Sequence, residues 1–310
     1  MDRLEAVVSM NNNPSLNRRR FLRSAGALAG SCFVPALTLA APTPKVSAHL
    51  WVYASAHPPD WDATPDLERV FSDLQFSGFD GLELMAVDLR HNDAVDHIGG
   101  LSERFKLPVT GSSFGGDMWD EKKHDVILQD ATVAIDRLSQ LNGKTFGLSV
   151  GDAKHVKTDA ELDQQVAVLK EIFAMCAAHG ILPNLHNHTY EVVNGMHDLK
   201  GTLARLPDAK LGPDLNWLIR GGVDPVTFIH EFGSQMVYMH LRDQYPNGVW
   251  TEYLGQGSTD FSAIAAALNA INYQGRAAVE LAWPDKFVPT QPLSKSWKDS
   301  RKFVRRTFGW

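Results

Sequence analysis

The sequence predicts one α/β domain in which eight parallel strands close into a (β/α)8 barrel. Short apolar or alternating runs alternate with longer segments of helical period, a pattern typical of parallel strands joined by crossover helices. Eight such units fit into the roughly 270 residues that follow residue 40, and α/β barrels of that length form one domain. An open doubly wound sheet is the rival. It is disfavoured because YASAHPPDWD, not a glycine-rich phosphate-binding turn, follows the first strand.

The predicted elements alternate along the whole domain. The eight candidate strands cover 46–53, 79–86, 107–114, 144–151, 181–188, 209–215, 235–243 and 276–283. Helical patterns lie between them, and three of these close on a glycine, as a helix C-cap prefers: 64–78, 161–180 and 260–275. We expect the tail from Pro284 to Trp310 to pack against the barrel with a short basic helix, and we see no second domain.

Residues 1–40 have the plan of an export signal rather than of a folded segment. Four arginines form its basic region: Arg18, Arg19, Arg20 and Arg23. A mildly apolar stretch ending in TLAA follows. The order RRxFLR is similar to a twin-arginine (Tat) signal, although Asn17 stands where Ser or Thr is usual. We therefore predict a signal peptide over 1–40, a barrel domain over 41–310, the Tat export machinery as a partner and a periplasmic location.

Composition and cysteine content exclude several alternatives. A stable membrane anchor is disfavoured because the apolar stretch is rich in Gly and Ala, and a lipoprotein at Cys32 is disfavoured because Ala29 replaces the expected Leu. Removal of the signal leaves Cys176 alone, so no intramolecular disulfide can form. The net charge of −6, with no basic run outside the two ends, argues against a nucleic-acid partner.

Polar residues collect near the ends of the predicted strands, where barrel enzymes carry their active sites. They are Glu83, His186, His188, Asp214, His240, Asp243 and Glu280. Asp214 and Glu280 are flanked by apolar residues, and a buried charge needs a partner. Each residue alone would more often be a cap or a satisfied core group. The set His186, Asp214, His240 and Glu280 from four neighbouring strands instead favours one divalent ion, for which Mn, Co, Fe or Zn fits better than Ca.

The remaining polar candidates are weaker. For Glu83, a substrate-binding or supporting role competes evenly with a salt bridge. His57 follows the first strand and is a candidate for the rim of the mouth, whereas the other histidines lack such a context: His49, His124, His155 and His179.

The stretch NLHNHTYE (184–191) contains two histidines two positions apart. Alternation along a strand would place both on one face, but His188 falls at or beyond the predicted strand end. We therefore assign His186 to the metal, and His188 with Glu191 to the substrate or to groups that support the ligands.

The order of several motifs resembles the sugar phosphate isomerase/epimerase family, which has the xylose isomerase-like TIM barrel. The motifs are GFDGLEL, LHNHTYE, DLNWLIRGGVDPVTFI, YMHLRD, LGQGSTDFSAI and AAVELAW, and they span nearly the whole predicted domain. This resemblance implies metal ligands at His186, Asp214, His240 and Glu280. It also implies that Trp217 and Glu191 face the substrate or support the ligands.

Two departures from the family are informative. Many epimerase members have a glutamate where His186 stands, and that glutamate and the one on the eighth strand form a pair of opposed bases. Two opposed bases suit epimerisation, because one removes a proton and the other returns it to the opposite face. The histidine favours a one-base reaction. In YMHLRD, Arg242 stands where the family's HxKD motif usually has a lysine, which keeps the charge but changes its geometry. We assign Arg242 to substrate binding.

The resemblance implies divalent-metal-dependent enolisation of a sugar or keto-sugar, of the isomerase or epimerase type. Glu280, His188 or Glu83, in that order, would remove the proton next to the carbonyl. Two alternatives stay open: a 3-keto-glycoside lyase that eliminates the aglycone, and a non-catalytic sugar-binding barrel. A phosphorylated substrate is disfavoured by the predicted export, and a homo-oligomer is left open.

Overall fold

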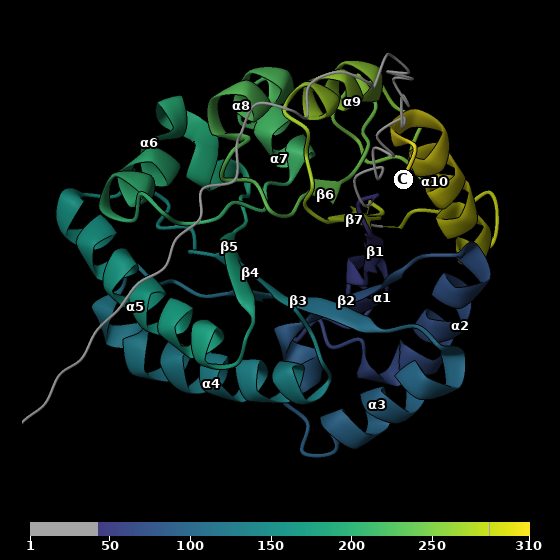
Figure 1. Ribbon diagram of the computed structural model, residues 1–310, viewed down its shortest axis with the longest axis horizontal. Helices are drawn as coiled ribbons and strands as arrows, with labels where there is room; N and C mark the ends of the chain where they lie inside the picture. Colours follow the sequence, from purple (N-terminus) through teal and green to yellow (C-terminus); the bar gives the residue numbers. More distant parts are fainter. Residues whose placement is uncertain (1–42, 285) are drawn as a thin grey trace, which may run out of the picture. The chain divides into compact units, whose positions relative to one another are not determined.

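The computed structural model describes residues 43–284 and 286–310, so the predicted signal over 1–40 lies outside the described part of the chain. A curled sheet of seven parallel strands is surrounded by helices (Figure 1). The strands are β1 (Val46–His49), β2 (Gly81–Met85), β3 (Val109–Gly115), β4 (Thr145–Ser149), β5 (Leu182–Leu185), β6 (His240–Leu241) and β7 (Ala277–Glu280). Their order in the sheet is β5-β4-β3-β2-β1-β7-β6, which is the order of a barrel opened between β5 and β6.

The segment predicted as the sixth strand closes this gap without forming a regular strand. Leu211 makes parallel bridges to Leu185 in β5 and to Met236, and Asp214 pairs with His240 in β6. Gly212 donates its N–H to the Leu185 carbonyl at 2.9 Å. Pro213 has no N–H to donate, which prevents a continuous ladder here. Because hydrogen bonds join both sides, the predicted (β/α)8 barrel is confirmed with one strand reduced to bridges.

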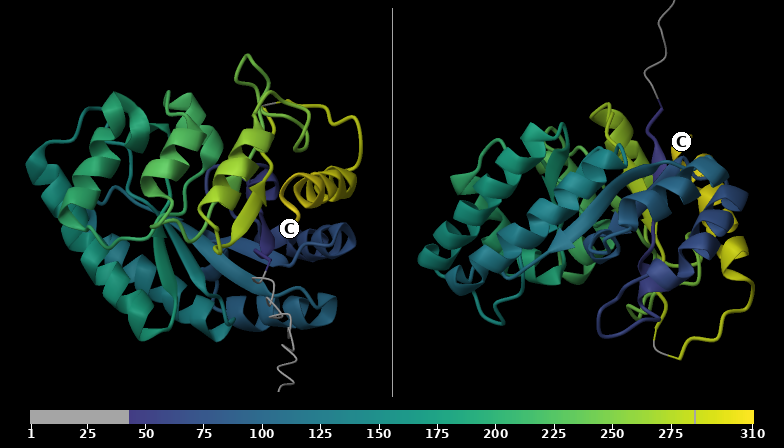
Figure 2. Two further views of the ribbon diagram at one scale, coloured as in Figure 1. Left: turned by 45° about the horizontal axis from the view of Figure 1, so that its top comes forward. Right: turned by 90° about the horizontal axis from the view of Figure 1, so that it is seen from below.

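Helices α1 to α10 alternate with the strands and cover the outside of the sheet (Figure 2). They are α1 (Trp51–Ala54), α2 (Leu67–Ser77), α3 (Ala94–Phe105), α4 (His124–Gln140), α5 (Asp159–Ala178), α6 (Thr189–Arg205), α7 (Leu215–Arg220), α8 (Pro225–Phe232), α9 (Phe261–Ala270) and α10 (Leu293–Phe308). Short 3₁₀ turns lie at Thr64–Asp66, Ala86–Leu89 and Glu121–Lys123. The regular backbone of α6 is interrupted from Val193 to Met196.

Several predicted bounds were too long. The first predicted strand, 46–53, ends at His49 and continues as the single turn α1. The predicted strand 235–243 contains only β6 and a bridge. Gly78 and Gly180 do follow α2 and α5 with positive φ, but α9 ends at Ala270, five residues before Gly275, so the third glycine cap was wrong.

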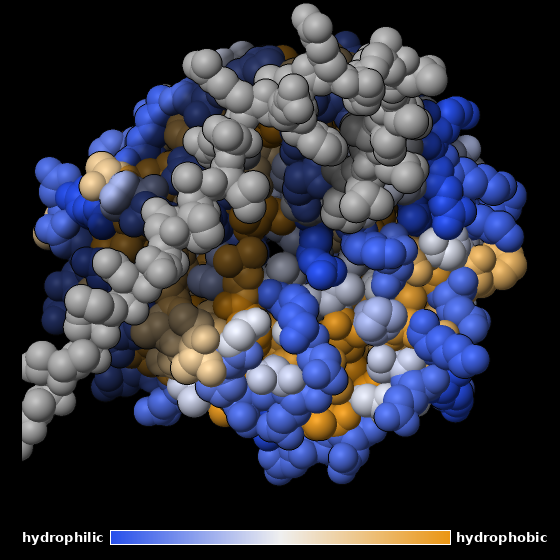
Figure 3. All heavy atoms as spheres, viewed as in Figure 1, coloured by the Kyte–Doolittle hydropathy of each residue, from blue (hydrophilic) through white to orange (hydrophobic). Residues whose placement is uncertain are grey.

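The C-terminal tail packs against the barrel through α10, which is a long helix rather than the short one expected. It contacts α2 and α9. Trp297 of α10 is fully buried and donates its Nε1–H to the Tyr53 hydroxyl at 3.0 Å. Hydrophilic side chains dominate the outer rim of the molecule, with hydrophobic ones visible further inward (Figure 3). Within residues 43–284 and 286–310, the helices are too short or too polar to cross a membrane.

Candidate active site

Buried polar side chains gather at the carboxyl ends of the strands. The parallel pairing sets His49 of β1 opposite Glu83 of β2 on one side and opposite Glu280 of β7 on the other. All three side chains are almost fully buried. Because the ends of parallel strands lie at one edge of a barrel, three neighbouring strands bring these groups into one layer.

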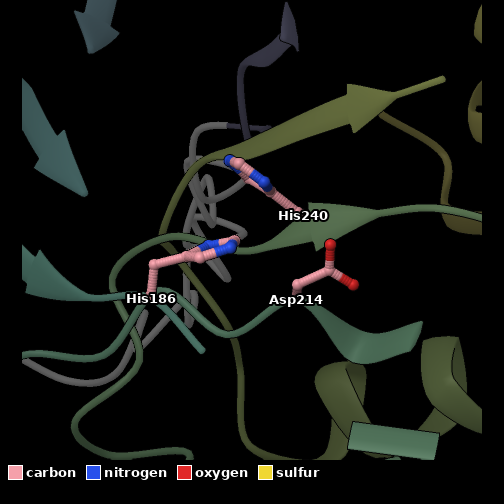
Figure 4. Close-up of side chains that lie close together, drawn as sticks. All are labelled: His186, Asp214 and His240. Carbon is pink, nitrogen blue, oxygen red and sulfur yellow. The ribbon is translucent and has the colours of Figure 1, made fainter. Parts of the chain in front are cut away.

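The four residues predicted as metal ligands come from neighbouring positions around the barrel. His186 directly follows β5, Asp214 is the N-cap of α7, His240 begins β6 and Glu280 ends β7. Ligand atoms of His186, Asp214 and His240 all lie within 4.8 Å of one another. Their side chains approach a common space from three separate segments (Figure 4).

The Asp214 carboxylate has one oxygen engaged and one without a well-directed donor. Oδ1 accepts the N–H groups of Asn216 and Trp217, at 2.9 and 3.1 Å, and so caps α7. Oδ2 lies 2.7 Å from Nε of Arg242, yet neither atom completes a hydrogen bond of good geometry. Burial raises the pKa of Asp214, an effect that the Arg242 charge opposes. Oδ2 therefore has a cation beside it but completes no hydrogen bond, which leaves a lone pair for a metal ion.

His240 is held between two carboxylates. Its Nδ1 lies 2.7 Å from Glu280 Oε2, and its Nε2 lies 2.8 Å from Glu83 Oε2. The Tyr238 hydroxyl donates to the same Glu83 oxygen at 2.8 Å. Burial lowers the pKa of His240, but the two carboxylates outweigh it and raise the pKa to about 10.

Arg242 is the nearest protein cation to this cluster. Its guanidinium contacts both Asp214 and Glu280, two of the predicted ligands. Burial would raise the pKa of Glu280, but Arg242, His49 and His240 together overcome this effect and hold the pKa well below its usual range. Arg242 thus compensates two carboxylates that would otherwise repel each other inside the barrel.

These side chains line a cavity of about 880 Å³ at the mouth of the barrel. Its lining includes most of the cluster, among them His49, His186, His188, His240, Arg242 and Glu280. Trp217, predicted to face the substrate, also lines it. The His188 ring lies 5.6 Å from the Trp217 ring, centroid to centroid. The cavity and the cluster are therefore one site.

His188 lies beyond the end of β5, at the N-cap of α6. The sequence predicted that it falls at or beyond the strand end. Its Nδ1 lies 3.3 Å from both the Ser149 Oγ and the Tyr190 hydroxyl. Burial, aided by the nearby Arg242 charge, lowers the pKa of His188 to about 4. The imidazole is therefore neutral at neutral pH.

Four predicted site residues stand outside the cavity lining, and one of them is Asp214, which is fully buried beside His186 and His240. Glu83 lies behind His240 as its hydrogen-bond partner. Glu191 is buried and accepts the His188 N–H at 2.7 Å, which closes the first turn of α6. His57 pairs with Asp66 across 2.8 Å and is part-exposed. The structure thus brings together His186, His188, Asp214, His240, Arg242, Glu280 and Trp217.

Sequence reasoning missed His49 and Trp250. His49 lines the cavity, and its Nε2 lies 2.9 Å from Ser113 Oγ. It ends β1 but lies inside the predicted strand 46–53, so the strand-end argument passed it over. Trp250 lines the cavity from the loop after β6, and no strand pattern marks it. Asp243 anchors the neighbouring backbone, with Oδ2 accepting the N–H groups of Gly255 and Gly257.

The donor set fits one divalent ion. A carboxylate oxygen without a well-directed donor, at Asp214, faces two imidazoles that offer nitrogen ligands. A ligating histidine usually passes its second ring N–H to a carboxylate, as His240 does toward Glu83. Two imidazoles and carboxylate oxygens suit Mn, Co, Fe or Zn. A His/Asp site that could hold a metal is therefore present.

Comparison with solved structures shows the same fold. D-allulose 3-epimerase from Methylomonas sp. is 18% identical, with 87% of this chain and 100% of that chain covered and a TM-score of 0.67. 3-keto-D-glucoside 4-epimerase from E. coli is 17% identical, with 85% of this chain and 100% of that chain covered and a TM-score of 0.67. An L-ribulose 3-epimerase is 19% identical, with 86% of this chain and 95% of that chain covered and a TM-score of 0.68. No curated protein sequence matches the chain significantly.

The sequence itself matches a family over most of the described domain. The model of the xylose isomerase-like TIM barrel family aligns with residues 66–307. This range includes every strand from β2 to β7 and all of the predicted metal ligands. The chain belongs to the xylose isomerase-like TIM barrel family.

Proposed function

We propose that this protein catalyses metal-assisted proton abstraction next to the carbonyl of a sugar or keto-sugar, a reaction of the isomerase or epimerase type. The observation that carries the proposal is geometric: the His188 imidazole, whose hydrogen bonds among the described residues involve Nδ1 alone, lines the same cavity as His186, His240 and Glu280. The similarly folded proteins are epimerases of allulose, ribulose and a 3-keto-glucoside, which supports the substrate class.

Three side chains already offer ligand atoms within 4.8 Å of one another and would hold the ion: His186, Asp214 and His240. Glu280 would join them as the fourth ligand once one of its oxygens exchanged its present contact with His240 or Arg242 for the ion. A divalent ion supplies Lewis-acid polarisation of a substrate carbonyl and positive charge for the enediolate. His240 must release its Nδ1 proton to serve as a ligand. Glu83 stays hydrogen-bonded to Nε2 and keeps the ring in place.

His188 is the best placed base. Both oxygens of Glu280, which the sequence ranked first, are already bonded, Oε2 to His240 and Oε1 to Arg242. Among the described residues, the hydrogen bonds of the His188 ring involve Nδ1 alone, so Nε2 can accept the proton of a substrate carbon. Ser149 and Tyr190 orient the ring by their bonds to Nδ1. General base catalysis of this kind typically contributes about 10²–10⁴-fold.

A single neutral base has a consequence for the outcome of the reaction. With His186 in the ligand set, His188 both removes and returns the proton, so return to the opposite face lacks a second base. Return of the proton to the same carbon from the same face regenerates the substrate, whereas its delivery to the neighbouring carbon gives the isomer. Elimination of a leaving group gives a keto-glycoside lyase, the second candidate, which the size of the 880 Å³ cavity favours.

Solvent-deuterium incorporation tests enolisation directly. Purified protein loaded with Mn²⁺ is incubated in D₂O with a panel of ketohexoses and 3-keto-glucosides, and the products are analysed by mass spectrometry and NMR. Deuterium next to the carbonyl, lost in His188→Ala, supports the proposal. Release of the aglycone identifies the lyase. Tight binding without exchange in any compound identifies a sugar-binding barrel and contradicts catalysis.

We also propose, from the sequence of residues 1–40, that the protein is exported by the Tat machinery. A reporter fused behind this segment should reach the periplasm, and replacement of Arg18 and Arg19 by lysine should retain it in the cytoplasm. Export that survives the double replacement would contradict the Tat route.

A further inference from the structure

Tryptophans form an arc along one half of the cavity. Five of the eight tryptophans of the chain line it. Trp217 follows the bridged segment around Asp214, Trp250 follows β6, Trp283 follows β7, and Trp51 and Trp61 follow β1. Four successive strand positions of the barrel thus each contribute an indole to the same cavity.

The arc has an inner end beside the reacting groups. The Arg242 guanidinium carbon lies 5.5 Å from the centroid of the Trp217 ring and 5.1 Å from that of Trp250. The guanidinium carbon of Arg220 lies 3.4 Å from the Trp250 ring centroid, so a second cation stacks on one face of that ring. Nε1 of Trp217 is buried without a hydrogen-bond acceptor among the described residues. The inner end therefore places two indole rings beside the Arg242 guanidinium and close to His188.

The outer end consists of Trp51 and Trp61. Their ring centroids lie 5.6 Å apart at an interplanar angle of 44°. Trp61 is 38% exposed, which is unusual for so large an apolar side chain. Its φ is +56°, a region that a bulky residue rarely adopts. The Trp61 N–H donates to the His57 carbonyl at 2.8 Å, which helps hold this conformation. Strain of this kind persists where a binding surface requires it.

The two ends of the arc follow strands at well-separated positions of the barrel. Three strand spacings separate the bridged segment from β1, about 14 Å along the curved sheet at 4.7–4.9 Å per strand. The cavity of about 880 Å³ is near the upper end of the range typical for drug-sized ligands, which are much larger than one sugar ring. The ligand that fills the arc therefore has more than one ring.

We propose that the cavity binds a glycoside with at least two sugar rings, the reacting ring at the inner end and the second ring on the Trp51–Trp61 pair. Indole faces pack against the C–H face of a sugar ring, and carboxylates accept its hydroxyl hydrogens. Asp60 lines the cavity next to Trp61 and supplies such an acceptor. This inference rests on the proposed sugar function, and it specifies the substrate class of the same site.

A pair of unreactive ligands tests the second subsite without turnover. Methyl β-D-glucopyranoside and methyl β-cellobioside have no free carbonyl, so neither can enolise. Their binding to the full-length Mn²⁺-loaded protein is measured by titration calorimetry. We expect the cellobioside to bind at least about tenfold more tightly. Trp61→Ala should reduce this preference about five- to tenfold and leave the affinity for the glucoside unchanged, whereas Trp61→Phe retains most of it.

Phe76→Ala is the matched control, because Phe76 is an exposed aromatic residue outside the cavity lining. It should change neither affinity, and equal melting temperatures of the variants would show that Trp61→Ala is folded. Equal affinities for the two ligands, no binding of either, or an equal loss of both in Trp61→Ala would overturn the second subsite. A two-ring preference without deuterium exchange would instead contradict only the enzymatic function.

Discussion

The imidazole of His240 and the carboxylate of Glu83 form a buried hydrogen bond across 2.8 Å, and neither side chain is more than 3% exposed. Glu83 approaches Nε2, while Glu280 contacts the opposite nitrogen. The orientation of a predicted metal ligand is therefore fixed by a residue that does not line the cavity itself.

Replacement of Glu83 by Gln should lower the affinity for Mn²⁺ by about 10–100-fold, because the carboxylate behind a ligating histidine orients the ring and raises its basicity. Competition with a chromogenic chelator measures this affinity. Tyr238→Phe removes only the phenol hydrogen bond to the same carboxylate and should have a smaller effect. Unchanged affinity in Glu83→Gln would show that Glu83 does not support the site.

Replacement of Arg242 by Met should destabilise the metal-free protein by about 3–5 kcal/mol, because it leaves Asp214 and Glu280 buried without their cation. Saturating Mn²⁺ should restore much of this stability. Urea unfolding with and without metal measures both values. Arg242→Lys keeps the charge without the two-pronged geometry and should lie between wild type and Met. An equal loss with and without metal would contradict the charge-compensation role.

Replacement of His186 by Glu tests the one-base interpretation. The variant should still bind a divalent ion, since a carboxylate replaces an imidazole in the ligand set. It should also gain a second base, and so yield product with inverted configuration at the deuterated carbon. NMR of products formed in D₂O distinguishes the two faces. Inverted product already present with the wild-type protein would show that His186 does not limit the reaction to one face.

Stability should depend on pH through Glu191. Burial raises the pKa of its carboxyl from 4.5 to about 8 in the folded protein. The folded state thus binds a proton that the unfolded state has released, so this group's contribution to stability is complete below about pH 4.5 and is lost as pH rises to about 8. Each unit of pKa corresponds to about 1.4 kcal/mol.

Glu191→Gln removes this titration and retains an acceptor for the His188 N–H. The melting temperature of the variant relative to wild type should therefore increase as pH rises from 5 to 8, which thermal scans at each pH measure. A constant difference across this range would contradict the raised pKa. The exposed ion pair of Glu68 and Arg104 offers a control, because neither side chain is buried and the guanidinium stays charged, so Glu68→Gln should show no such trend in the same window.

The alternation of short apolar runs and helical patterns was sufficient to predict the barrel, since parallel strands with crossover helices have few other solutions. Strand ends were harder to predict. The run from Val46 to Tyr53 is mostly apolar on both sides of His49, but it turns into α1 after that residue. Local pattern cannot locate that break, because the hydrogen-bond partners that end a strand lie on β2 and β7.

The sequence by itself determined which residues reach the mouth of the barrel: side chains at strand ends meet there, as His186, Asp214, His240 and Glu280 do. Their division of labour was decided only by the tertiary structure. Glu83 contacts His240 from behind, Arg242 occupies the space between two carboxylates, and Trp61 extends the cavity outward. These roles depend on distances between segments far apart in the chain, and a linear pattern carries no information on those distances.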